Sequence, residues 1–302
     1  MSGGEGAPRH RIERAPIGYR VRGPGILIWE PTLDEARARR DELELGRWRA
    51  AERRAPLRAA FLPHEMVYGP VRSRRLGRSL GVDLSPPGCR VCSFDCVYCT
   101  ARDLPRPDRA ARWPEPREVR RAIEAALARR PALDSVTISG HGEPTFHPRF
   151  PEVVDVVLGA VAASGVRVPV RILTNGTQAV RAPVRRALDR LAERIVKLDA
   201  DAARIDRPLA ACPPGARLVA LGLLRDVTLQ SCFVDGVVSN VAPTSVRAWA
   251  ELVGEIAPRG VQIYTIDERP PAVGIRAVGA AALEEIACEL RTRTGIEARV
   301  FA

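Results

Sequence analysis

The stretch Cys92-Ser93-Phe94-Asp95-Cys96-Val97-Tyr98-Cys99 says more about this chain than any other part of it. Its cysteines have the spacing C-x3-C-x2-C, and the aromatic Tyr98 stands directly before the last of them. Cysteine thiolates hold iron–sulfur clusters, and a 4Fe-4S cluster takes about four such ligands. Three cysteines therefore leave one iron open to a small molecule. The run predicts a cluster of this kind on Cys92, Cys96 and Cys99.

Other cysteine sites need different spacings. A zinc ribbon pairs C-x2-C with a second pair about 15–20 residues away, and no such pair stands there. Bacterial ferredoxins use C-x2-C-x2-C-x3-C-P, in which the gaps come in another order. Cys89 leaves an alternative open, because with it the run offers four ligands for a closed cluster or a zinc site. A turn at Pro86-Pro87-Gly88 just before Cys89 favours Cys89 as a bystander.

The cysteine run resembles the cluster loop of the radical S-adenosylmethionine (SAM) enzymes. The resemblance implies that the open iron binds the amino and carboxylate groups of SAM and passes it one electron. The sulfonium C–S bond would then break to give methionine and a 5′-deoxyadenosyl radical, which abstracts hydrogen from a substrate. It also implies SAM as a partner, an electron donor such as flavodoxin or ferredoxin, and an incomplete barrel as the fold.

The chain from Tyr68 onward alternates strand patterns with helix patterns, which is typical of parallel β/α architecture. Strands are expected at 79–84, 135–139, 168–173, 195–198, 227–231 and 261–265. Helices are expected at 116–130, 150–163, 182–194, 216–225 and 245–257, followed by a helix at 280–294 and a strand at 297–301. The pattern predicts an α/β fold, and its six units match the partial (β/α)6 TIM-like barrel that the resemblance implies. Because such folds place their sites after the strand carboxyl ends, the cysteine run lies where chemistry is expected.

Three regions are expected along the chain. Residues 1–65 form an Arg-rich extension with a short strand at 26–29 and one helix at about 32–54, which starts with a capping-box pattern. Residues 66–275 form the core barrel, and 276–302 add a helix and a strand packed on it.

The composition indicates where the protein is located and which kinds of partner it could bind. No apolar run is long enough to cross a bilayer and no signal peptide is recognisable, so a cytoplasmic protein without membrane contact is expected. The net charge of +11 favours a polyanion such as RNA. However, Lys197 is the only lysine among 47 basic residues, which indicates nucleotide bias rather than selection for charge. The alternative to an enzyme is a non-catalytic, basic RNA-associated protein with a structural metal. The oligomeric state is unknown.

The run Ser139-Gly140-His141-Gly142-Glu143-Pro144-Thr145 follows the second expected strand. Its glycines permit close approach of the backbone to a ligand. Gly142, Glu143 and Pro144 resemble the G-G-E-P motif of radical SAM enzymes, whose backbone and carboxylate hold the amino group of SAM. His141 interrupts the paired glycines, and both a functional and a structural role are open for it.

Three polar residues at the ends of later strands complete the expected cofactor site. The resemblance implies that Asn175 contacts the ribose or the carboxylate of SAM, although turn formation is the simpler interpretation. Lys197, retained in a chain that favours arginine, is expected to pair with the SAM carboxylate, and Asp199 to bind a ribose or the substrate. Weaker candidates on the last strands are Gln230, Ser231 and Tyr264.

Residues 68–81 form a basic Gly/Ser-rich block, which we expect to be a loop; its four arginines make it a candidate anion cradle, although a solvent-exposed basic loop is the simpler interpretation. This block, the run 139–147 and the late block 266–271 resemble the radical SAM branch that contains the wyosine-type tRNA-modifying enzymes and unassigned bacterial proteins. The resemblance leaves a tRNA substrate open. Two departures matter: no cysteine precedes Cys89 to bind a second cluster, and Glu268 interrupts the late block.

Overall fold

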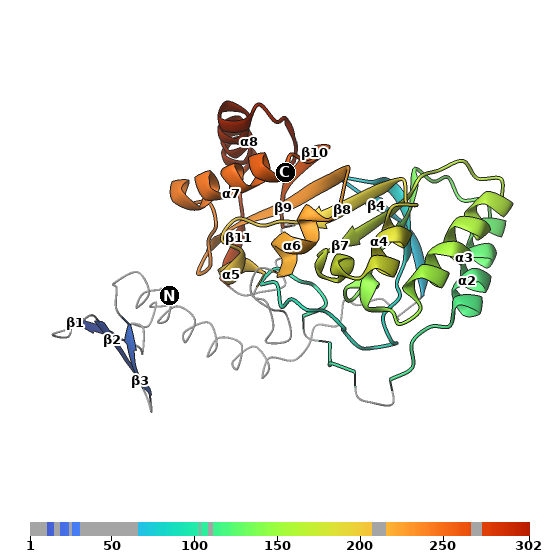
Figure 1. Ribbon diagram of the computed structural model, residues 1–302, viewed down its shortest axis with the longest axis horizontal. Helices are drawn as coiled ribbons and strands as arrows, with labels where there is room; N and C mark the ends of the chain where they lie inside the picture. The colour runs from blue at the N-terminus through green and yellow to red at the C-terminus, as the bar shows by residue number, and fades with distance from the viewer. Residues whose placement is uncertain are drawn as a thin grey trace, which may run out of the picture. The chain divides into compact units, whose positions relative to one another are not determined.

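The fold is taken from a computed structural model that describes residues 66–102, 104–107, 111–206, 216–266 and 274–302, and the backbone of three earlier strands. The chain divides into two compact units, Met1–Ala60 and Phe61–Ala302. In the first unit, β1 (Arg11–Arg14), β2 (Tyr19–Gly23) and β3 (Ile26–Glu30) form an antiparallel sheet (Figure 1). The expected strand at 26–29 is confirmed, and the expected helix at 32–54 lies outside the described residues.

The second unit is built on one curled sheet, and the partial TIM-like barrel expected for it is confirmed (Figure 1). Its parallel strands follow one another in sequence order: β5 (Gly77–Val82), β6 (Ser135–Ile138), β7 (Val170–Thr174), β8 (Glu193–Lys197), β9 (Val227–Gly236), β10 (Gly260–Thr265) and β12 (Ala298–Phe301). Two antiparallel strands that the sequence did not predict flank them, β4 (Val67–Ser73) on β5 and β11 (Ile275–Ala277) on β9.

Helices connect the parallel strands. They are α2 (Pro116–Ala128), α3 (Phe150–Ala163), α4 (Ala182–Leu188), α5 (Ala202–Ile205), α6 (Ala216–Gly222), α7 (Pro243–Ile256) and α8 (Ala280–Thr294), with short 3₁₀ turns at Pro144–Phe146 and Thr177–Val180. The helix expected at 182–194 is longer than the observed one, because α4 ends at Leu188 and β8 begins at Glu193. Among the described residues, every helix is too short or too polar to cross a membrane.

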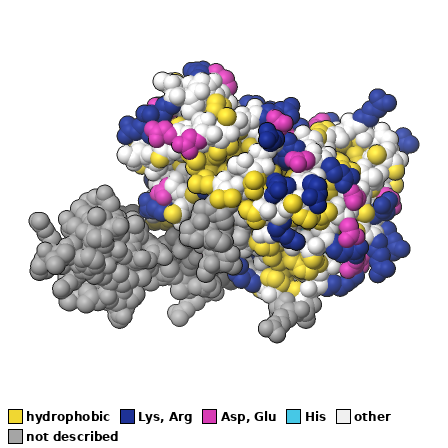
Figure 2. Space-filling model, in the orientation of Figure 1, with side chains coloured by type: hydrophobic (Ala, Val, Ile, Leu, Met, Phe, Trp, Pro, Cys, Tyr) yellow, Lys and Arg dark blue, Asp and Glu magenta, His cyan; other side chains and the backbone are white. Residues whose placement is uncertain are grey.

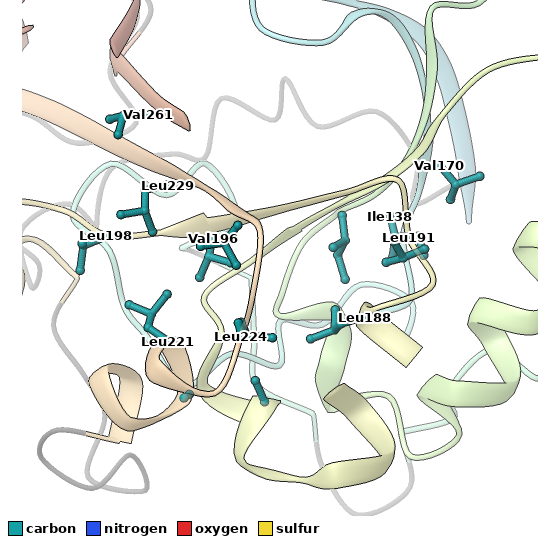
Figure 3. Close-up of a cluster of buried hydrophobic side chains, with 14 of the residues drawn as sticks. Ile138, Val170, Leu188, Leu191, Val196, Leu198, Leu221, Leu224, Leu229 and Val261 are labelled. Atoms are coloured by element: carbon teal, nitrogen blue, oxygen red, sulfur yellow. The ribbon is translucent and has the colours of Figure 1, made fainter. Parts of the chain in front are cut away.

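The core lies between the outer face of the sheet and these helices. Ile138, Val196 and Leu229 from the strands are buried with Leu188 and Leu221 from the helical side (Figure 3). Burying such side chains stabilises the fold by about 1.5–3 kcal/mol each. Because strand residues alternate between faces, the residues between these apolar ones lie on the concave face.

The concave face is polar, in contrast to the outer face. Neighbouring strands meet there through Ser79 and Thr137, whose hydroxyl oxygens are 2.7 Å apart, and through Gln230, whose Nε2 donates to Gln262 at 2.9 Å. Arg171 and Glu193 form an ion pair of 2.9 Å on the same face. The side of the barrel that faces its interior is therefore lined with groups that can bind a polar ligand.

The basic block at 68–81 is not the loop that we expected. It is the β4–β5 hairpin, with its turn at Arg74-Arg75-Leu76. Tyr68 and Gly81 are paired across the two strands. The Tyr68 ring lies over Gly81, where a Cβ atom would be 2.1 Å from the ring. The glycines that favoured a loop instead serve this close packing between strands.

Candidate functional site

The three cysteines lie in the loop that follows β5. Cys92, Cys96 and Cys99 are free and half-buried, and the Cys99 backbone N–H donates to the Cys96 carbonyl oxygen at 3.0 Å. Burial, together with the charge of Glu143, raises the pKa of the Cys92 thiol to about 12, and burial raises that of Cys96 as well. A bound metal must displace the thiol protons, and iron supplies the positive charge that would stabilise buried thiolates. The donor set therefore fits an iron–sulfur cluster.

Neighbouring segments hold the cysteine loop on two sides. On one side, Asp95 N donates to Asp206 O and Val97 N to Ile205 O, both at 3.0 Å. On the other side, Glu143 N donates to Val91 O at 2.8 Å. A Cβ atom on Gly142 would lie only 2.3 Å from Val91 O. The loop that contains Gly142 and Glu143 therefore packs directly against the cysteine loop, and it can do so only with glycine at 142.

Glu143 is buried and hydrogen-bonded on both carboxylate oxygens. Oε1 accepts from Thr174 Oγ1 at 2.5 Å and from Thr145 N at 3.1 Å, and Oε2 accepts from Asn175 N at 2.6 Å. Burial raises the pKa of Glu143, and these donors offset the rise only in part. The carboxylate ties the loop after β6 to the end of β7. Its expected contact with the amino group of SAM stays a prediction, as does that of Pro144, which begins a 3₁₀ turn.

Asn175 joins the end of β7 to the cysteine loop. Its Nδ2 donates to Ser93 Oγ at 2.9 Å and lies 3.6 Å from Cys92 Sγ. Its Oδ1 accepts from the backbone N–H and the hydroxyl of Thr177, at 3.0 and 2.8 Å. All of these contacts are with other residues of the protein. The structure thus places Asn175 beside Cys92, and its contact with SAM stays a prediction.

Lys197 and Asp199 meet at the carboxyl end of β8. Lys197 Nζ lies 2.9 Å from Asp199 Oδ1 and donates to Tyr264 OH at 3.0 Å. Tyr98, from the cysteine loop, donates its hydroxyl to Asp199 Oδ2. Burial disfavours the Lys197 ammonium, but the acidic groups around it, Asp199 first among them, together outweigh burial and hold the pKa of Lys197 above its usual value. The sequence named these residues separately, and the structure brings them together beside the cysteines.

Sequence reasoning missed two charged residues of this site. Asp206 is fully buried, forms an ion pair with Arg217 and lies 3.8 Å from Cys96 Sγ. Burial and the charge of Asp199 raise the pKa of Asp206 to about 8. Arg90 donates to Asp95 at 2.8 Å, and its positive charge lies close to Cys99. These residues belong to no motif, because each acts through a contact that only folding creates.

Several other polar residues have structural roles. His147 donates from Nε2 to Pro114 O at 2.8 Å and accepts from Arg149 N at 3.1 Å, so it supports the entry to α3. Ser231 donates to Leu198 O at 2.5 Å. His141 is hydrogen-bonded to Asp83.

The two cysteines after the cysteine loop that the structure describes differ in exposure. Cys232 is buried and Cys288 is exposed, whereas Cys212 and the block 267–273 lie outside the described residues. Among the described residues, no three His, Cys, Asp or Glu side chains gather to hold a single metal ion.

Comparisons with known proteins agree with this geometry. The family model described as "Radical SAM superfamily" matches residues 87–209. A UPF0026 protein of Helicobacter pylori is 33% identical over 216 residues, which cover 67% of this chain. The match spans 66% of that relative, just under two thirds of its length.

Two solved structures share the fold. Streptococcus suis SuiB bound to S-adenosylmethionine matches 73% of this chain and 49% of its own, with a TM-score of 0.52 and 14% identity. TYW1 with a lysine-pyruvate adduct bound matches 72% of this chain and 74% of its own, with a TM-score of 0.51 and 15% identity. At these identities the likeness is one of fold alone.

Proposed function

Because this chain belongs to the radical SAM superfamily of enzymes, we propose that Cys92, Cys96 and Cys99 hold a 4Fe-4S cluster that cleaves SAM reductively. When bound, such a cluster supplies one electron to SAM, giving methionine and a 5′-deoxyadenosyl radical that abstracts hydrogen from the substrate. The observation that carries the proposal is the anchoring of the cysteine loop between the Gly142 loop and Asp206. This anchoring presents three thiols at the carboxyl ends of the strands, where parallel β/α proteins place their sites.

The protein's own residues would position SAM and exclude water. On one side of the cysteine loop, Glu143, which stands between Gly142 and Pro144, is hydrogen-bonded to Val91. Asn175 also contacts Cys92, and Asp199, which holds Lys197, accepts a hydrogen bond from Tyr98. Lys197 carries a positive charge within the concave face and is held in place by Asp199 and Tyr264. A buried cation of fixed position suits a carboxylate such as that of SAM.

The proposal assigns no substrate. On the face that Figure 2 shows, basic side chains are scattered among acidic and apolar ones instead of gathering in one patch. An RNA substrate such as tRNA, a flavodoxin or ferredoxin as electron donor, and a cytoplasmic location all stay predictions.

A direct experiment tests the cluster and the chemistry together. Protein reconstituted without oxygen and supplied with SAM and dithionite is expected to form 5′-deoxyadenosine, and to contain about four irons per chain. Cys96→Ala should abolish the product. Cys288→Ala, which changes an exposed cysteine on α8, serves as the matched control and should keep it. One zinc per chain, or undiminished product from the Cys96→Ala protein, would show that the cluster assignment is wrong.

A further inference from the structure

The four arginines of the β4–β5 hairpin differ in their surroundings. Arg78 forms an exposed ion pair of 3.1 Å with Asp134. Arg74 donates from Nη2 to Thr265 O at 3.0 Å, so the hairpin turn reaches the end of β10. Arg72 is exposed and has no ion pair with any residue that the structure describes. Arg75 is the exception, since its side chain turns inward and is half-buried.

Arg75 has a positive charge that no carboxylate among the described residues neutralises. Its guanidinium carbon lies 3.9 Å from the centre of the Tyr264 ring. Its Nε atom is buried and makes no hydrogen bond within the described part of the chain, where no carboxylate pairs with it either. A buried N–H group without an acceptor is unfavourable. The described residues therefore leave a place beside Arg75 that an oxyanion could fill.

Contacts connect Arg75 to the proposed SAM site. The Tyr264 ring that it covers also lies 4.6 Å from Lys197 Nζ, and Lys197 Nζ lies 4.8 Å from the ring of Tyr98. Tyr98 directly precedes Cys99. Lys197 is held by Asp199 and is the cation proposed above for the carboxylate of SAM, whereas no carboxylate in the described part of the chain pairs with Arg75. Of the two cations beside Tyr264, Arg75 is thus the one left for an anion of the substrate.

We propose that Arg75 binds an oxyanion group of the substrate, a carboxylate or a phosphate, and thereby determines which molecules reach the radical. This inference rests on the proposed function and names the substrate class of the same site. The guanidinium offers two parallel N–H donors that match either group. Stacking on Tyr264 fixes the plane of the guanidinium, which reduces the entropy lost when those hydrogen bonds form.

Chemical modification tests the inference without a known substrate. Cluster-loaded full-length protein is treated with phenylglyoxal, which reacts with guanidinium groups, and the rate at each arginine is followed by peptide mass spectrometry. Inorganic phosphate or acetate is expected to slow the reaction at Arg75 severalfold relative to chloride of equal ionic strength. Arg72, exposed on the same hairpin, is the internal control and should react at an unchanged rate.

Each outcome of the phenylglyoxal experiment either supports or overturns the inference. Protection by phosphate alone supports a phosphate-bearing substrate, and protection by acetate alone supports a carboxylate. Protection by both supports the oxyanion class. Absence of protection, or equal protection of Arg72, overturns the inference. So does protection by methionine at far lower concentrations than acetate, because Arg75 would then serve the carboxylate of SAM.

The companion variants separate this inference from the proposed function. The anion that protects Arg75 should raise the Tm of wild type and of Arg72→Gln, but not that of Arg75→Gln. If wild type forms 5′-deoxyadenosine and neither phosphate nor acetate protects Arg75, only the anion site fails. If Arg75 is protected and no 5′-deoxyadenosine forms, the anion site stands and the radical chemistry fails.

Discussion

Replacement of Gly142 by alanine tests the contact that holds the two site loops together. The added methyl carbon would lie 2.3 Å from Val91 O and 3.0 Å from Val91 N, all backbone atoms that cannot rotate away. The loops must then separate by about 1 Å to reach ordinary contact, and forced overpacking of this kind costs about 1–3 kcal/mol. Separation also breaks the 2.8 Å hydrogen bond from Glu143 N to Val91 O, which adds about 0.5–1.5 kcal/mol.

The expected total for Gly142→Ala is therefore a loss of about 1.5–4.5 kcal/mol in the free energy of unfolding. Urea unfolding of the iron-free protein measures it as a lower midpoint with an unchanged m-value. Because Val91 directly precedes Cys92, we also expect incomplete iron loading after reconstitution.

Gly159→Ala is the matched control. Gly159 lies exposed in α3, and a Cβ atom there would meet nothing within 4 Å. Alanine should stabilise that helix by about 1 kcal/mol. If Gly142→Ala unfolds at the wild-type urea concentration and takes up full iron, the two loops are not packed as described, and the argument from the Val91 carbonyl is refuted.

Two further predictions concern residues around the site. Asn175→Ala removes the amide that donates to Ser93 Oγ, and should lower the free energy of unfolding measured in urea by about 1–3 kcal/mol. An unchanged urea midpoint would show that Asn175 does not stabilise the cysteine loop. Burial holds the pKa of His147 below its usual value of 6.5, so the folded state binds fewer protons than the unfolded state. Stability should therefore fall as the pH drops below about 6.5, and His147→Gln should flatten this dependence in Tm measurements. An equally steep fall in the variant would assign the effect to another group.

The periodicity of the sequence was enough to predict the barrel strands and most of their helices. Runs such as 135–139 and 261–265 alternate apolar with polar residues and are bounded by turn residues, so their class follows from local pattern. The β4–β5 hairpin was missed because its glycines and arginines are typical of a loop. Only the packing of Tyr68 over Gly81 and the pairing with β5 make that segment a strand.

By itself, the sequence was enough to predict which chemistry this protein carries. The spacing of Cys92, Cys96 and Cys99 indicates the proposed donor set, because three thiols in a single short loop can reach one cluster. Tertiary structure alone decided what surrounds that loop. Asp206 beside Cys96 and Arg75 over Tyr264 are pairs of residues far apart in the chain. A contact of this kind has no local signature, since it exists only after the sheet has curled and brought the ends of separate strands together.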